Sequence, residues 1–107
     1  MRLTVLASAT RHGITGEEIR AVVFYPVLRT RLTPRLPGAV PHLFIGKFDE
    51  DEPLIEVIAD LADPGEWIVF HAMMLRRELV EQTRLGALLA EADRDFAPQR
   101  KERRGRA

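Results

Sequence analysis

The sequence predicts an α+β domain whose elements follow the order β-α-β-β-β-α. Four short segments alternate apolar and polar residues as strands do, and two others space their apolar residues as helices do. The chain has 107 residues, of which 46% are hydrophobic, and this suits one domain with a single core. Because short turns join the last three strands, we expect an antiparallel sheet with helices packed on one face.

The chain should begin with a strand, a short helix and a long loop. Residues 2–8 alternate as a strand does. Thr15 and Glu18 then form a capping-box pattern, in which the Thr15 hydroxyl accepts from the third helical amide and Glu18 reaches back. Pro26 ends this helix, and the four prolines of residues 25–41 indicate an extended loop.

Three strands should follow, at residues 42–48, 54–61 and 66–72, separated by charged or Pro-Gly turns. In the middle strand, alternation points Glu56 and Asp60 toward solvent. The residues expected to face the core in the last two strands are Ile55, Val57, Ala59, Leu61, Ile68, Phe70 and Ala72.

The last predicted helix spans residues 75–92, and Thr83 and Gly86 weaken its middle, so we expect a kink or break near Gly86. Apolar periodicity then ends. Residues 94–107 hold six basic and two acidic residues, a net charge of +4. We therefore expect one domain over residues 1–93 and a basic, disordered tail over residues 94–107.

Composition narrows the classes of function. The chain has no cysteine, so thiol chemistry and cysteine-ligated zinc are excluded, and no apolar run is long enough to span a bilayer. We expect a cytoplasmic protein without a membrane segment. Residues 49–66 contain eight acidic residues and no basic one. This acidity counts against nucleic-acid binding, unless a local patch or the basic tail supplies positive charge. No motif indicates a cofactor or a metal site.

His71 is the leading candidate for chemistry. It ends the last predicted strand, on the face opposite the core-facing residues, and Arg76 and Arg77 follow at the start of the helix. Histidine titrates near neutral pH and suits proton transfer, while arginine offers a fixed positive fork for phosphate oxygens. The alternatives are a structural histidine bonded to a backbone carbonyl and two arginines on a solvated helix face.

A second candidate group precedes the first helix. His12 could transfer a proton there, and Arg11 could add positive charge near the free amides of the helix N-terminus. The alternative is a plain turn that needs the backbone freedom of Gly13. The three histidines are too far apart in sequence to indicate a metal site.

Several segments together resemble one protein family. Residues 12–18 read His-Gly-Ile-Thr-Gly-Glu-Glu, residues 43–46 Leu-Phe-Ile-Gly and residues 54–57 Leu-Ile-Glu-Val. Residues 68–72 read Ile-Val-Phe-His-Ala and are followed by Arg-Arg-Glu at 76–78. In this order and spacing they resemble BrnT-type toxins of toxin-antitoxin systems.

The resemblance covers roughly residues 11–81 and implies a fold like that of RelE-type ribonucleases. It further implies metal-independent cleavage of RNA, no cofactor, and a cognate antitoxin protein as partner. On this basis we expect His71, Arg76, Arg77 and His12 to be catalytic and Arg11 to contact the substrate. Nothing in the sequence fixes the oligomeric state.

The chain also departs from the family pattern. Members usually carry Ser-Ala-Arg where this chain reads His71-Ala72-Met73, and the body of the domain is acidic. A second hypothesis follows, a non-catalytic interaction module whose basic tail binds an acidic partner or nucleic acid. A third is a homologue on the same fold without activity.

Overall fold

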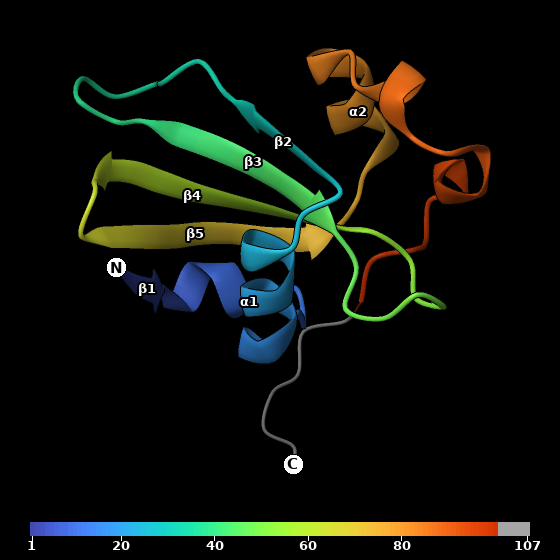
Figure 1. Ribbon diagram of the computed structural model, residues 1–107, viewed down its shortest axis with the longest axis horizontal. Coiled ribbons are helices and arrows are strands. Elements are labelled where there is room, and N and C mark those ends of the chain that lie inside the picture. The colour runs from blue at the N-terminus through green and yellow to red at the C-terminus, as the bar shows by residue number, and fades with distance from the viewer. Residues whose placement is uncertain (101–107) are drawn as a thin grey trace.

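The computed structural model describes residues 1–100 and forms an α+β fold with a five-stranded sheet and two α-helices (Figure 1). The elements are β1 (Arg2–Val5), α1 (Gly16–Phe24), β2 (Leu28–Arg31), β3 (Pro41–Gly46), β4 (Ile55–Asp63), β5 (Glu66–Met74) and α2 (Arg77–Thr83). Three short 3-10 helices complete them: η1 (Ala7–Thr10), η2 (Gly86–Leu88) and η3 (Glu91–Arg94). Among the described residues, no helix has the length and apolar character needed to cross a membrane.

The sheet is mixed, whereas the sequence predicted an antiparallel one. Its strand order is β1-β5-β4-β3-β2. Strands β3 to β5 form the expected antiparallel meander, and β2 adds a further antiparallel strand beside β3. β1 lies at the edge and pairs with β5 in parallel. Short turns force neighbouring strands to reverse direction, but η1, α1 and β2 separate β1 from the meander, so no turn fixes its direction.

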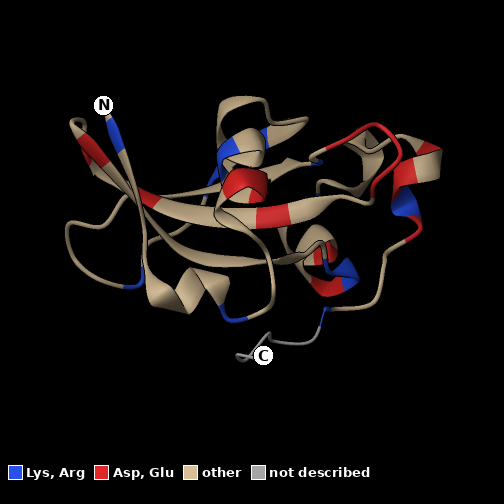
Figure 2. Cartoon of the chain, turned by 90° about the horizontal axis from the view of Figure 1, so that it is seen from below, with Lys and Arg blue, Asp and Glu red and all other residues tan. Residues whose placement is uncertain are grey.

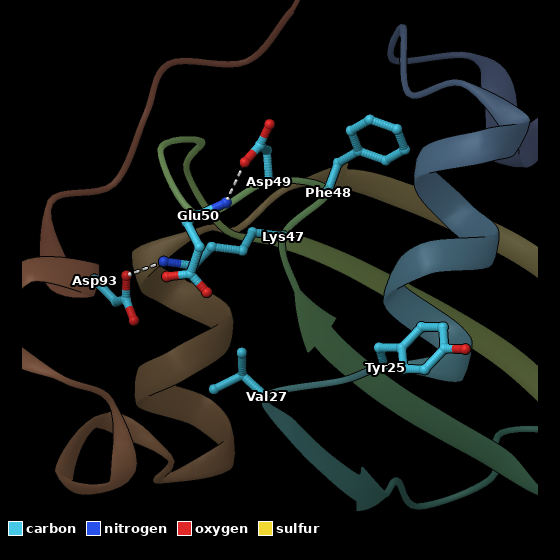
Figure 3. A pocket seen from close by; sticks show the side chains of 7 residues that line it. All are labelled: Tyr25, Val27, Lys47, Phe48, Asp49, Glu50 and Asp93. Atoms are coloured by element: carbon cyan, nitrogen blue, oxygen red, sulfur yellow. Dashed lines mark hydrogen bonds and ion pairs between the residues drawn. The ribbon is translucent and has the colours of Figure 1, made fainter.

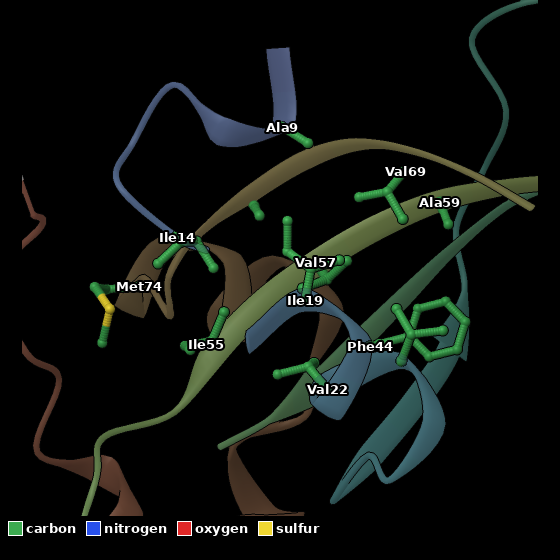
Figure 4. Close-up of a cluster of buried hydrophobic side chains, with 12 residues drawn as sticks. Ala9, Ile14, Ile19, Val22, Phe44, Ile55, Val57, Ala59, Val69 and Met74 are labelled. Atoms are coloured by element: carbon green, nitrogen blue, oxygen red, sulfur yellow. The ribbon is translucent and has the colours of Figure 1, made fainter. Parts of the chain in front are cut away.

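The two α-helices lie on opposite faces of the sheet, which corrects the prediction that they share one. On β3, Phe44 belongs to the apolar cluster of α1, together with Ile19 and Val22 (Figure 4). Its neighbours Leu43 and Ile45 belong to a second cluster with the residues of α2 and the turn after it. Since successive residues of a strand point to opposite faces, the sheet separates two cores.

A bulge in β5 explains why the expected facing of this strand is partly wrong. Ile58 of β4 pairs with His71 and Ala59 pairs with Val69, so Phe70 is left without a partner. Val69 is therefore buried in the α1 cluster, while Phe70 is 39% exposed. The bulge also separates Trp67, which packs against the α1 cluster, from His71 on the other face.

The chain beyond β5 differs from its prediction. Helix α2 ends at Thr83, before the expected break near Gly86, because Arg84 takes the left-handed conformation with φ of 59°. The segment predicted to be a disordered tail folds back over residues 94–100: the Gln99 side chain bonds both backbone groups of Met74, and Arg100 pairs with Glu18. The rest of that predicted tail, residues 101–107, lies outside the described residues.

The segment of residues 25–41, which was predicted to be an extended loop, contains strand β2.

Candidate functional site

The centre of the candidate site is a carboxylate that the sequence analysis placed in solvent. The side chain of Glu56, in β4, is 0% exposed on the face covered by α2. As predicted, Glu56 and Val57 point to opposite faces of the sheet, and the side chain of Val57 enters the α1 cluster. The prediction was wrong because the second face is also covered. A strand buried on both faces leaves no solvent side for a polar residue.

Two of the predicted residues converge on Glu56. His71 Nε2 lies 2.7 Å from Glu56 Oε2, and Arg76 Nη2 donates to the same oxygen over 2.8 Å. Arg76 Nε lies 3.1 Å from both carboxylate oxygens, and the Arg76 backbone amide donates to Oε1 over 2.9 Å. Both oxygens of a fully buried carboxylate are thereby satisfied, as burial of a charge requires.

Local structure explains how the three residues meet. The bulge at Phe70 turns His71 onto the α2 face, and Glu56 lies on the same face two residues before Ile58, the partner of His71. Arg76 is the N-cap of α2 and has extended backbone angles, so its amide is free of the helix. That amide points at Glu56, which accepts at the positive end of the short helix.

The electrostatics keep Glu56 ionised. Burial alone would raise the pKa of Glu56, but the hydrogen bonds from His71 and Arg76 outweigh it and hold the pKa below its ordinary value. An ionised carboxylate only accepts, so His71 donates its Nε2 proton to it. In the neutral ring, Nδ1 then carries the free lone pair. The side chain of His71 is 23% exposed, so solvent reaches part of this ring.

The other predicted residues lie apart from this cluster. Arg77 is exposed, and its guanidinium carbon lies 4.8 Å from the ring centroid of Phe96. Arg11 is exposed and His12 half-buried in the turn between η1 and α1. Within residues 1–100, neither side chain makes a hydrogen bond or ion pair. The structure thus joins His71 to Arg76 and does not join Arg77, Arg11 or His12 to them.

Two open pockets in the described part of the chain lie away from His71. One is lined by Tyr25, Val27, Lys47, Phe48, Asp49, Glu50 and Asp93, with an ion pair of 3.0 Å between Lys47 and Asp93 (Figure 3). The other is lined by Thr15, Glu17, Glu18, Phe48, Glu52 and Arg100. Neither contains a residue of the cluster. Both pockets are therefore separate from the cluster, which lies on the α2 face of the sheet with the side chain of His71 23% exposed.

The cluster has the parts of a general base. A buried carboxylate fixes the ring of His71, selects the tautomer with a free Nδ1 and stabilises the imidazolium that forms when this nitrogen takes a proton. Arg76 compensates the charge of Glu56. With His71 protonated, the three groups together carry one net positive charge. Among residues 1–100, no three side chains of metal-ligating type gather at one place.

Comparison with known protein families, with curated proteins and with solved structures finds no match to this chain. The sequence signal that could have revealed Glu56 is the acidic residue between Ile55 and Val57, in a strand that continues into apolar residues. A charge in such a strand is buried when both faces are covered, and it then requires partners. Two such partners, His71 and Arg76, were already candidates.

Proposed function

We propose that the chain is the toxin of a toxin-antitoxin system, with a BrnT-like fold, and that it cleaves RNA at His71 without a metal ion. The observation that carries this proposal is the 2.7 Å hydrogen bond from His71 to the buried, ionised Glu56. It is supported by the α+β architecture with its capped N-terminal helix and antiparallel meander. A cognate antitoxin protein would neutralise the toxin.

The proposed reaction is transfer of the phosphoryl group within the RNA. His71 Nδ1 takes the proton of a ribose 2′-hydroxyl, and the 2′-oxygen attacks the adjacent phosphorus. The bond from phosphorus to the 5′-oxygen breaks, which leaves a 2′,3′-cyclic phosphate and a 5′-hydroxyl. The imidazolium returns its proton to the leaving oxygen. Glu56 is a positioning residue here, and Arg76 supplies charge near the phosphate.

The test measures cleavage of an end-labelled, single-stranded RNA by the purified chain in EDTA. We expect His71→Ala to lower the rate at least 100-fold, the range of a general base. Met73→Ala, two residues along the same strand, is the matched control and should keep the rate. His12→Ala should also keep it, since His12 lies outside the cluster. Equal rates for His71→Ala and Met73→Ala would remove the assignment of the base.

Growth provides the biological arm of this test. Induced expression of the wild-type chain should arrest growth and degrade RNA, and His71→Ala should do neither. A small protein encoded next to this chain should restore growth when both are expressed. Growth arrest that persists in His71→Ala would show a toxic activity other than the one proposed.

The alternative is an interaction module without catalysis. It is favoured by the pairing of Arg76 with Glu56, which uses the arginine as a structural partner and not for binding phosphate. Its basic segment would bind an acidic protein or nucleic acid. Since residues 94–100 contact the fold, the clean deletion is residues 101–107, which hold four basic residues and one acidic residue. A nuclease should keep cleaving RNA after this deletion, whereas a module of this kind should lose its partner.

A further inference from the structure

One segment of the chain, which the proposed reaction does not use, carries basic residues without any acidic ones. Residues 19–48 contain five basic residues and no acidic one, and the acidic turn of residues 49–52 follows directly. Figure 2 shows this turn as a continuous acidic segment at one end of the molecule. Two of the basic residues, Arg29 and Arg31, lie on β2, the edge strand of the sheet.

Arg29 is held in place by two aromatic rings. Its guanidinium carbon lies 4.9 Å from the ring centroid of Phe44 and 5.2 Å from that of Trp67. Its Nε donates to His42 Nδ1 over 3.4 Å. Such stacking restricts the side chain while leaving other N–H groups of the guanidinium free to donate. An arginine ordered in advance loses less entropy when it binds an anion.

Arg31 extends this arrangement along the same face. It pairs in register with His42, as Arg29 pairs with Phe44, and residues two apart on a strand share a face. The two arginine positions are therefore separated by roughly 7 Å, twice the rise of a strand. Within residues 1–100, no carboxylate forms an ion pair with either arginine.

The lowered pKa of His42 reflects its burial and, in part, the positive charges of Arg29 and Arg31 beside it. Burial lowers the pKa of His42, and the charges of Arg29 and Arg31 lower it further. Because Nδ1 accepts from Arg29, the neutral ring carries its proton on Nε2 and remains a hydrogen-bond donor. Two guanidinium groups and one neutral donor therefore lie together, and all of them recognise anions.

We propose that Arg29, Arg31 and His42 form a phosphate-contacting surface for single-stranded RNA, on the face of the sheet opposite His71. The choice of RNA rests on the function proposed above, whereas the anion site rests on the geometry alone. The strand would cross the edge at β2, with one phosphate at each arginine. This surface would bind and retain the substrate, and it would take no part in the chemical step.

The experiment uses the His71→Ala chain, so that the RNA remains intact, and follows binding of a fluorescent single-stranded RNA by anisotropy at several salt concentrations. Arg29→Gln together with Arg31→Gln should weaken binding at least tenfold. It should also reduce the slope of log affinity against log salt by roughly 1.4, about 0.7 for each phosphate of a single strand that is no longer neutralised. The control is Arg84→Gln with Arg94→Gln, which removes the same charge from two arginines elsewhere on the chain.

Equal binding by the two double variants would overturn the proposal. So would equal displacement of the RNA by polyglutamate of similar charge, because the surface would then not select phosphodiesters. If loss of the Arg29 stack unfolds the chain, Arg31→Gln alone should still reduce the salt slope by roughly 0.7. An unchanged slope there would also overturn it.

The two proposals can fail separately. RNA binding that depends on Arg29 and Arg31, without cleavage by the wild-type chain, would remove the nuclease and keep this surface. Cleavage with a KM that does not change in the Arg29→Gln and Arg31→Gln variant would do the reverse.

Discussion

The two faces of the sheet are filled in different ways. The core of the α1 face is a cluster of apolar side chains, including Phe44 and Val57, each 0% exposed. The α2 face buries apolar side chains around Glu56, which accepts hydrogen bonds from His71 and Arg76. An apolar face needs only matching shapes, but a buried carboxylate needs a specific partner at each oxygen. The face with the stricter demand is also the one that carries His71, the residue proposed to be catalytic.

Breaking the polar cluster should have the largest effect on stability. Glu56→Ala leaves Arg76 and His71 without their common partner, and we expect a loss of about 3–5 kcal/mol in the free energy of unfolding. Val57→Ala is the matched change on the opposite face and should cost less, roughly 2 kcal/mol for two lost methyl groups and a small cavity. Urea unfolding measures both. A greater loss for Val57→Ala would reverse the comparison of the faces.

Replacing the whole cluster separates charge from packing. In the triple variant Glu56→Leu, His71→Leu and Arg76→Met, no buried charge is left without a partner. Most of the stability lost in Glu56→Ala should return, as it does when buried ion pairs are exchanged for apolar residues. RNA cleavage should be absent from this variant, because the proposed base His71 is replaced. A triple variant no more stable than Glu56→Ala would mean that the cluster acts through its shape.

Acid should weaken the α2 face in a defined direction. The folded pKa of Glu56 lies below its ordinary value, so its contribution is complete above that ordinary value and is lost as the pH falls through the folded pKa. The effect should be smaller than that of Glu56→Ala, because protonation leaves the side chain in place. Unfolding by urea between pH 7 and pH 3 measures it. Glu56→Gln should flatten this part of the profile, and a profile parallel to that of the wild type would contradict the assignment.

Local sequence signals predicted much of the α1 face. The capping box of Thr15 and Glu18 is present as expected, with hydrogen bonds of 2.9 and 3.1 Å, and Ile55, Val57 and Ala59 are buried. These features depend on a few neighbouring residues and a regular period. The sequence also predicted the three strands of the meander, because charged or Pro-Gly turns separate them.

The α2 face and the site were predicted only in part, because they depend on contacts between distant segments. His71 and Arg76 were correctly placed near one another, since they are close in sequence. Glu56 was missed because its burial requires the coverage of a second face. The bulge at Phe70 cannot be predicted from the alternation of apolar and polar residues in β5. Strand β2 was missed because the prolines of its segment indicated a loop.

The contact between Arg100 and Glu18 should have a moderate effect. Arg100 donates to the two oxygens of Glu18 over 2.7 and 2.8 Å and to the Gly13 carbonyl over 3.2 Å, which holds the end of the described chain against α1. Arg100→Gln should lower stability by about 1 kcal/mol, because the pair is two-pronged but partly exposed. Arg11→Gln is the exposed control and should change stability by less than about 0.5 kcal/mol. Equal effects of the two changes would show that this contact is not stabilising.

The smallest expected change is a gain, at the end of α2. Arg84 adopts φ of 59°, a conformation that glycine takes without strain and other residues take at a cost. Arg84→Gly should therefore raise the free energy of unfolding by roughly 0.5–1 kcal/mol, whereas Arg84→Ala removes the same guanidinium and keeps the strain. Thermal unfolding of both variants measures the cost of the left-handed backbone conformation at this position. Equal unfolding midpoints would show that this cost is negligible. Because the N-cap of α2, Arg76, donates its amide to Glu56, a more stable end of this helix should stabilise the polar face and leave the α1 face unchanged.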